Sequence, residues 1–321
     1  MSRFTRNTVV LAEIESVYGT DVVPTGADAV LMSNPSHKLT TNNVKRDIIR
    51  PYFGNSEELV GTKYLETSLE AEFVGGGTAG TAPAWGKLLR GCAFAETVEA
   101  ATRVDYLPVT DVQESLSMYI YRSGALRKSL GSRGKLSIAM KVGEIPKLKF
   151  AMMGLYGGLT AADPSGVDFT AWTVPTVVTH ANSVKLYIGS TRNATAAPVV
   201  TGGTQFPSLG IELDLGLDVP LTALVGGETI DVTNRALTGK VTLDLTAAQE
   251  VTNEAIVLAN TLQSICFIHG TAAGKKVGVF APSMQFTNPA DQELNGRRLI
   301  TYDLIGVPSA AGNDELRIFT F

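Results

Sequence analysis

Apolar and polar residues alternate strictly between Tyr64 and Phe73. Successive side chains of a β-strand point to opposite faces, so a period of two predicts a strand with one dry and one wet face. The dry face would hold Leu65, Thr67, Leu69, Ala71 and Phe73, and the wet face Tyr64, Glu66, Ser68, Glu70 and Glu72. This stretch therefore predicts a half-buried strand.

A longer period follows the glycine-rich turn GGGTAG. One face of an α-helix repeats at i, i+3, i+4 and i+7, and these positions hold Trp85, Leu88, Leu89 and Cys92. Thr81 stands where an N-cap would lie, and Pro83 falls in the first turn. We expect one amphipathic helix packed on the sheet.

The same order of strand and helix recurs near residue 240. GKVTLDL is followed by AIVLANTLQSICF, where a helix would begin at a cap on Thr252 or Asn253 and bury Ala255, Ala259, Leu262 and Cys266. The separation from Leu69 to Cys92 is 23 positions, and so is that from Leu243 to Cys266. We interpret this as a tandem duplication, with residues 1–157 and 158–321 as the two copies of one domain.

Other segments extend the β pattern. Residues 116–120 and 136–142 alternate as two strands of a hairpin, with residues 122–134 as its long basic tip, and residues 209–219 give the cleanest alternation. The composition of residues 157–166 predicts a linker. The predicted fold class is all-β, a β-sandwich or β-barrel domain with one flanking α-helix, duplicated in tandem.

Residue chemistry argues against an enzyme. The chain has two cysteines and three histidines, and it holds no G-x-x-x-x-G-K-[ST], G-x-S-x-G or H-E-x-x-H motif. The cysteines fall on apolar helix faces, and the acidic residues alternate along strands about 7 Å apart with no loop to converge them on calcium. We expect no catalytic residue, no cofactor and no metal.

Charge and hydropathy limit the kinds of partner that the chain could bind. The formal net charge is −4, and 44% of the residues are hydrophobic. Because acidic residues are in excess, the chain does not belong to the proteins that bind nucleic acid through a basic surface. No signal peptide opens the sequence and no apolar run is long enough for a membrane helix, so we expect no membrane partner.

Two segments look like contact surfaces. Residues 40–61 and 122–134 are long and mix charge with apolar or aromatic side chains, a composition that suits an interface. The alternative is a surface loop folded on its own domain. The candidate contact residues are Arg46, Arg50, Tyr52, Phe53, Arg127, Lys128 and Arg133.

Four stretches resemble the major tail tube protein of long, non-contractile bacteriophage tails, the siphophage tail tube family. They are TVVLAEIESVYGTDVVPTGADAVLMSNPS, VKRDIIRPYFGNSEELVGTKYLETSLEAEF, GTAGTAPAWGKLLRGCAF and FPSLGIELDLGLDVPLTALVGGETIDVTNRALTGKVTLD. The resemblance implies β-sandwich domains that assemble into rings, inner sheets that join into a barrel, and stacked rings that conduct DNA. It places the protein in the virion tail, and in the host cytoplasm during assembly.

The resemblance also implies partners. Members typically place six domains in a ring, so two domains per chain implies a trimer with pseudo-sixfold symmetry, whereas one domain per chain implies six chains. Besides itself, the chain would meet a tape measure protein in the lumen, other tail proteins at the tube ends, and DNA in non-specific passage. The alternatives are a capsid decoration or tail-spike-like protein, or a cytoplasmic carbohydrate-binding β-sandwich.

The wet strand faces are the candidates for the lumen lining. A barrel strand turns one face to the core and the other to the channel, and an acidic wall would not hold DNA phosphates. We expect a net negative lumen, with an outer solvent-facing position as the alternative. The candidate residues are Glu66, Glu70, Glu72, Glu212, Asp214 and Asp218.

Overall fold

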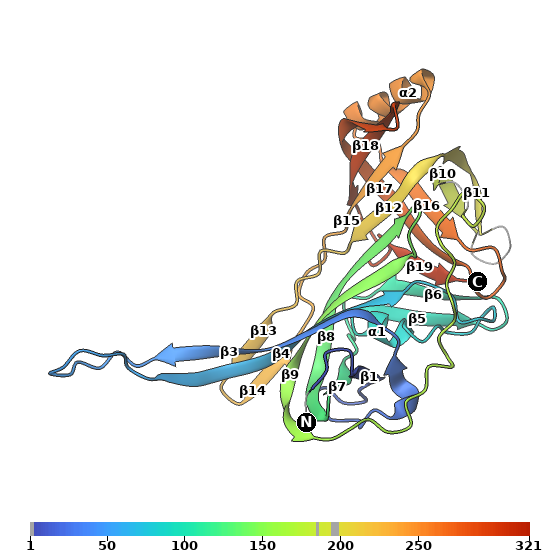
Figure 1. Ribbon diagram of the computed structural model, residues 1–321. Coiled ribbons are helices and arrows are strands. Elements are labelled where there is room, and N and C mark those ends of the chain that lie inside the picture. The colour runs from blue at the N-terminus through green and yellow to red at the C-terminus, as the bar shows by residue number, and fades with distance from the viewer. Residues whose placement is uncertain (1–2, 184–185, 194–198) are drawn as a thin grey trace.

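The computed structural model describes residues 3–183, 186–193 and 199–321. Most of the regular structure is β-strand, and a single hydrogen-bonded network contains 17 strands (Figure 1). A separate hairpin consists of β13 (Leu221–Leu224) and β14 (Gly227–Ile230). The all-β class predicted from the alternation is confirmed.

Eight antiparallel strands form one long layer. Across the sheet their order is β3 (Ser33–Lys45), β4 (Glu58–Glu72), β9 (Lys147–Ala161), β8 (Ala125–Lys141), β12 (Ser208–Asp214), β15 (Thr238–Leu243), β18 (Arg297–Gly306) and β17 (Val277–Leu294). At the centre β8 pairs with β12, and Met140 lies opposite Ile211. This pair joins the first half of the chain to the second in one sheet.

The remaining strands cover one face of the long layer in two groups. The first group is β2 (Ala29–Val30), β1 (Thr8–Ile14) and β7 (Leu116–Arg122), and β7 pairs with the first part of β8. The second runs β5 (Phe94–Glu99), β6 (Arg103–Pro108), β19 (Arg317–Thr320), the first part of β17, β16 (Gln263–His269), β10 (Leu186–Arg192) and β11 (Val200–Phe206). Both β8 and β17 therefore change partners along their length.

The core lies between these layers. All five residues of the predicted dry face of β4 are buried, which confirms the strand and its orientation. Leu69 and Phe150 of the long layer belong to the same apolar cluster as Ile120 of β7 and Val279 of β17. Because this cluster includes both halves of the chain, the halves share one core.

The pattern of strand pairing occurs twice. In the first half β1 pairs with β2 and β7, and the chain of pairs β7–β8–β9–β4–β3 follows. In the second half β10 pairs with β11 and β16, and the pairs β16–β17–β18–β15–β12 follow in the same order. A helix comes after the second long-layer strand in each half, α1 after β4 and α2 after β15.

The helices differ from the sequence prediction. Helix α1 is only Gly86–Arg90 with Trp85 as its N-cap rather than Thr81, although all four residues of the predicted apolar face are buried. Helix α2 runs Ala247–Leu258 and begins at a capping box of Thr246 and Gln249. No residue of α2 is buried, so the predicted core face of Ala255, Ala259 and Leu262 is wrong.

Cys266 lies on a strand and not on a helix. It belongs to β16, where it is opposite Tyr187 on one side and Phe280 on the other. The run Ile265–Ile268 is buried residue after residue, which is the pattern of a strand covered on both faces. The cysteine spacing therefore does not mark equivalent positions in the two halves.

The predicted basic tip at residues 122–134 is also wrong, because this segment is mostly strand. The turn between β7 and β8 consists of Ser123 and Gly124, both with positive φ, as a two-residue hairpin turn requires. Strand β9 likewise continues to Ala161, so the predicted linker at residues 157–166 begins later. In the second half β12 ends at Asp214, but Leu215, Leu217 and Val219 stay buried beyond it.

A buried ionic cluster also connects the halves. The carboxylate of Asp105 on β6 lies 2.6 Å from Arg192 of β10 and 3.1 Å from Arg103. All three side chains are nearly inaccessible to solvent. Removing one partner would leave an uncompensated buried charge, so we expect this cluster to fix the position of β10 on β6.

A short 3₁₀ turn, η1 (Gly26–Asp28), completes the regular structure.

Candidate assembly surfaces

The long layer has one face packed on the core and one face that carries charge. Residues directly opposite in register share a face, and Glu66 lies opposite Lys38 and Met153, whereas Glu72 lies opposite Lys147. The register continues across β12 and β15, where Glu212 lies opposite Lys240. We call this surface the polar face; its charged residues are Lys38, Glu66, Glu70, Glu72, Lys135, Lys141, Lys147, Lys149, Glu212, Asp214, Lys240 and Asp303.

Opposite charges pair across the polar face. The ammonium group of Lys147 is 2.7 Å from the carboxylate of Glu70, and that of Lys141 is 2.6 Å from Glu212. The hydrogen bond from Lys147 is the main cause of a lowered pKa at Glu70, and the bond to Glu212 raises the pKa of Lys141. The cross-strand contacts therefore favour the charged forms of Glu70 and Lys141.

The acidic residues predicted to line the lumen have lysines beside them on this face. The twelve charged residues named above are six carboxylates and six lysines, so the polar face is balanced. Five predicted lumen residues lie on it, but Asp218 does not, because it follows β12 and pairs with Asn234 in an isolated bridge. The lysines come from neighbouring strands, which the spacing within one strand could not reveal.

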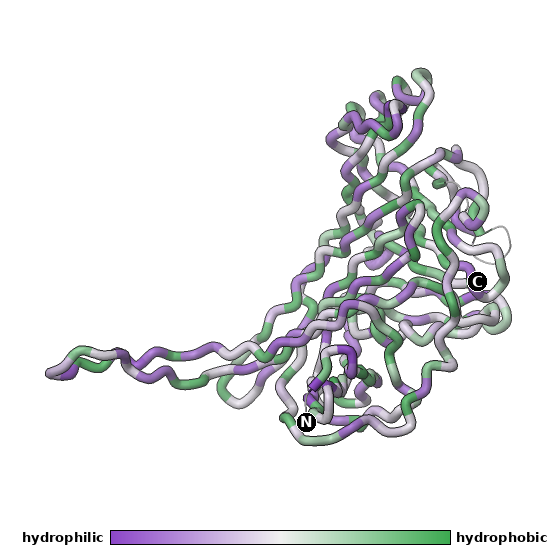
Figure 2. The backbone as a smooth tube through the Cα atoms, viewed as in Figure 1, coloured by the Kyte–Doolittle hydropathy of each residue, from purple (hydrophilic) through white to green (hydrophobic). Residues whose placement is uncertain are grey.

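Residues 40–61 form the outer part of a projecting hairpin, the arm, in which residues 46–57 connect β3 to β4. Strands β3 and β4 pair from Ser33 and Glu70 out to Lys45 and Glu58, and Figure 1 shows the hairpin extending well away from the body. We call residues 46–57 the arm tip. The sequence of the arm tip mixes polar and apolar residues without strict alternation (Figure 2). The two-residue period therefore did not show that a hairpin extends this far.

The arm tip exposes large apolar side chains. Ile49 is 99% exposed, Phe53 106% and Tyr52 65%. Arg46 forms an ion pair with Glu57 across the base of the tip, and the guanidinium of Arg50 lies 6.0 Å from the ring centre of Tyr52. Exposed apolar clusters of this kind are typical of contact sites. Ile49 was not among the contact residues predicted from the sequence, and only its exposure in the folded chain singles it out.

Two of the three basic contact candidates on β8 are occupied within the chain. Lys128 binds Asp21 at 2.8 Å, which is the main cause of its raised pKa. Arg133 is buried and donates to Asp231 and to the backbone oxygens of Glu114 and Ile230. These two side chains are therefore not free to contact another subunit. Arg127 instead lines a cavity.

The long layer also has two unpaired edges. Within the described residues β3 pairs only with β4, and residues 285–294 of β17 pair only with β18. An edge strand presents free N–H and C=O groups that can bond to a strand of another chain. The layer is thus open at both sides and able to extend by edge pairing.

The described residues contain no group of three or more His, Cys, Asp or Glu side chains placed to hold a metal ion. No helix among them has the length and apolar character needed to cross a membrane. Burial raises the pKa of both thiols, that of Cys266 to about 12, so neither cysteine is a reactive nucleophile.

A balanced polar face, open sheet edges and a projecting apolar arm define a structural protein built for assembly. The family model described as phage tail tube protein matches residues 5–306, and the chain belongs to that family. It is a structural component of the tail tube, located in the virion tail, and it self-assembles. A comparison with curated proteins returned no match.

Proposed function

We propose that three copies of this chain close one ring of the tail tube, with each chain supplying two equivalent domains. The observation that carries the proposal is the repeated pairing scheme, in which β3, β4, β9 and β8 correspond to β12, β15, β18 and β17. A duplicated domain gives each chain two similar positions in the ring, so three chains have pseudo-sixfold symmetry. The two copies would correspond to the domains predicted from the sequence, residues 1–157 and 158–321, except that the boundary moves to Ala161, where β9 ends.

Ring closure would use the sheet edges. The edge of β3 on one chain would pair with residues 285–294 of β17 on the next, and the resulting contact would imitate the β8–β12 pair that already joins the halves within a chain. Closure removes the exposed edges, which is a stabilising feature of any barrel.

The polar face would then line the lumen. Its opposite face is packed on the core, so the polar face is the surface of the long layer that is compatible with a water-filled channel. A wall of paired lysines and carboxylates gives DNA no continuous basic track to bind. We therefore propose a neutral lining for DNA and for a tape measure protein, in place of the acidic one.

The arm tip would contact a neighbouring subunit or ring, and the ends of the tube would meet other tail proteins. The exposed Ile49, Tyr52 and Phe53 support this role.

We further propose that the tail is long and non-contractile, because of the four sequence stretches quoted above. Micrographs of virions with a contractile sheath would contradict this proposal. Family membership favours the tube over capsid decoration, a tail spike or carbohydrate binding.

Native mass spectrometry of isolated rings tests the stoichiometry. We expect a mass three times that of the 34.0 kDa chain. A ring of six chains would refute the duplication as the basis of symmetry, because twelve domain positions would then be present.

A further inference from the structure

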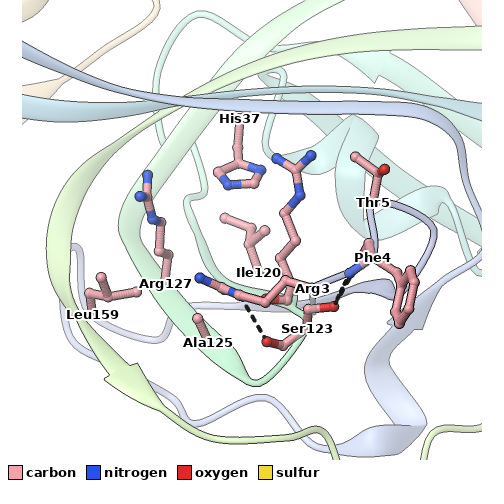
Figure 3. Close-up of a pocket in the computed structure, with 10 residues that line it drawn as sticks. Arg3, Phe4, Thr5, His37, Ile120, Ser123, Ala125, Arg127 and Leu159 are labelled. Carbon is pink, nitrogen blue, oxygen red and sulfur yellow. Dashed lines mark hydrogen bonds between the residues drawn. The ribbon is translucent and has the colours of Figure 1, made fainter. Parts of the chain in front are cut away.

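A cavity of about 350 Å³ opens at one end of the molecule, where the β7–β8 turn meets the base of the arm. Its walls come from the amino-terminal segment, from His37 on β3, from both sides of the turn and from β9 (Figure 3). The lining residues are Arg3, Phe4, Thr5, His37, Ile120, Arg122, Ser123, Ala125, Arg127 and Leu159.

The charge in this cavity has one sign. Three guanidinium groups and one imidazole line it, and none of the ten lining residues is acidic. Within the described part of the chain no carboxylate lies within ion-pair distance of Arg122 or Arg127, whereas the adjacent Lys128 has Asp21 at 2.8 Å. Arg3 donates to the backbone oxygens of Arg122 and Ser123, at 2.6 and 3.1 Å. These hydrogen bonds place the Arg3 guanidinium beside the β7–β8 turn.

The histidine experiences this field. Burial is the main cause of a lowered pKa at His37, and the charges of Arg127 and Arg122 lower it further. Clustered like charges repel when no counter-ion is present. Arginines in a partly enclosed site bind planar oxyanions through paired N–H donors.

From this arrangement we infer that the cavity is an oxyanion site, and that a carboxylate from a second copy of the chain fills it in the assembled tube. The inference rests on the proposed function in one respect. Lys38 is on the polar face and the adjacent His37 points to the opposite face, because its partner in register is the buried Thr67. If the polar face lines the lumen, the cavity opens away from it and passing DNA cannot reach it.

A carboxylate is also the anion that neighbouring subunits supply. The chain has 31 acidic residues, and the cavity lies at the base of the arm that would extend to the next subunit. A carboxylate bound between Arg122 and Arg127 would neutralise the positive charge of the cavity. Contact between the two subunits would then depend on this site.

The first test uses the unassembled subunit and inorganic phosphate as the probe. Nuclear magnetic resonance of His37, assigned with a His37→Asn variant, follows its pKa as phosphate is added against chloride at matched ionic strength. We expect a saturable rise in the His37 pKa. Arg127→Gln should weaken phosphate binding about tenfold, which is typical of one lost charge-assisted hydrogen bond.

The control is Arg6→Gln, which removes one exposed charge near the cavity but outside its lining. It should bind phosphate as the wild type does. Arg122→Gln is a second cavity variant in case Arg127→Gln alters folding, which circular dichroism would reveal. No saturable change at His37, or equal binding by the control and the cavity variants, would overturn the site.

The second test is tube assembly, followed by sedimentation. Arg127→Gln and Arg122→Gln should polymerise more slowly than Arg6→Gln, and Arg127→Lys should recover part of the loss. If the cavity variants lose phosphate binding yet polymerise normally, a carboxylate of a second copy is not the occupant. If wild-type rings are not trimeric while phosphate still binds, the proposed ring fails and the oxyanion site stands.

Discussion

The arm tip offers a prediction whose magnitude follows from exposure alone. Ile49 and Phe53 are fully exposed in the single chain, so they contribute nothing to its own core. If both are buried at a subunit contact, each should contribute about 1.5–3 kcal/mol. The double substitution Ile49→Ser with Phe53→Ser should therefore weaken that contact by about 3–6 kcal/mol, or roughly a hundred-fold to ten-thousand-fold in its equilibrium constant.

The assay measures the critical concentration for tube formation by sedimentation, alongside thermal unfolding of the unassembled subunit. We expect the critical concentration to rise steeply and the melting temperature to stay the same, because both side chains are fully exposed in the single chain. Val225→Ser is the matched control, since Val225 is 110% exposed at the β13–β14 turn.

Two outcomes would refute the reasoning. An unchanged critical concentration would show that the arm tip stays in solvent in the tube. A lower melting temperature of the variant subunit would show that the tip folds back on its own chain, which was the alternative considered from the sequence.

Two further predictions concern the polar face. Lys135→Glu with Lys149→Glu should leave folding intact but make DNA ejection slower and salt-dependent, because an acidic track replaces a neutral wall; ejection unaffected at any salt concentration would argue that this face is outside the lumen. Glu70 has a lowered pKa because of Lys147, so its contribution to stability should be complete above the ordinary glutamate pKa and lost as pH falls through the lowered folded value. Thermal melts from pH 7 to pH 2 should show Lys147→Ala less stable at neutral pH and converging with the wild type in acid, whereas Lys240→Ala, whose contact with Asp303 is 3.9 Å, should change little; parallel curves for Lys147→Ala and the wild type would contradict the linkage.

Local patterning was sufficient where one strand has one wet face. Leu65, Leu69 and Phe73 alternate with polar residues, and burial of one side of β4 follows directly from the two-residue period. The all-β class and the candidate lumen residues of β4 and β12 came from this same signal, whereas the burial of the cysteines was predicted from helical spacing. The family resemblance pointed in the same direction.

Patterning failed where burial is not one-sided. The segment around Cys266 is apolar on both faces, so it has no period of two and imitates a helix face. Helix α2 has no fully buried residue, and its Val257 packs on the core only in part, so its apolar period is weak. Its capping box at Thr246 and Gln249 is the clearer local signal. The arm likewise has no dry side along most of its length.

By itself the sequence determined which residues are apolar, where strands alternate, and the composition that excludes a basic nucleic-acid binder. Tertiary structure decided which strands lie side by side, and therefore everything that depends on charges from different strands. Six lysines opposite or beside six carboxylates make the polar face neutral, and Arg122, Arg127 and His37 meet at one cavity although His37 is far from both in the chain. Coulombic interactions depend on distance in space, and sequence separation does not encode that distance for antiparallel strands joined by long connections.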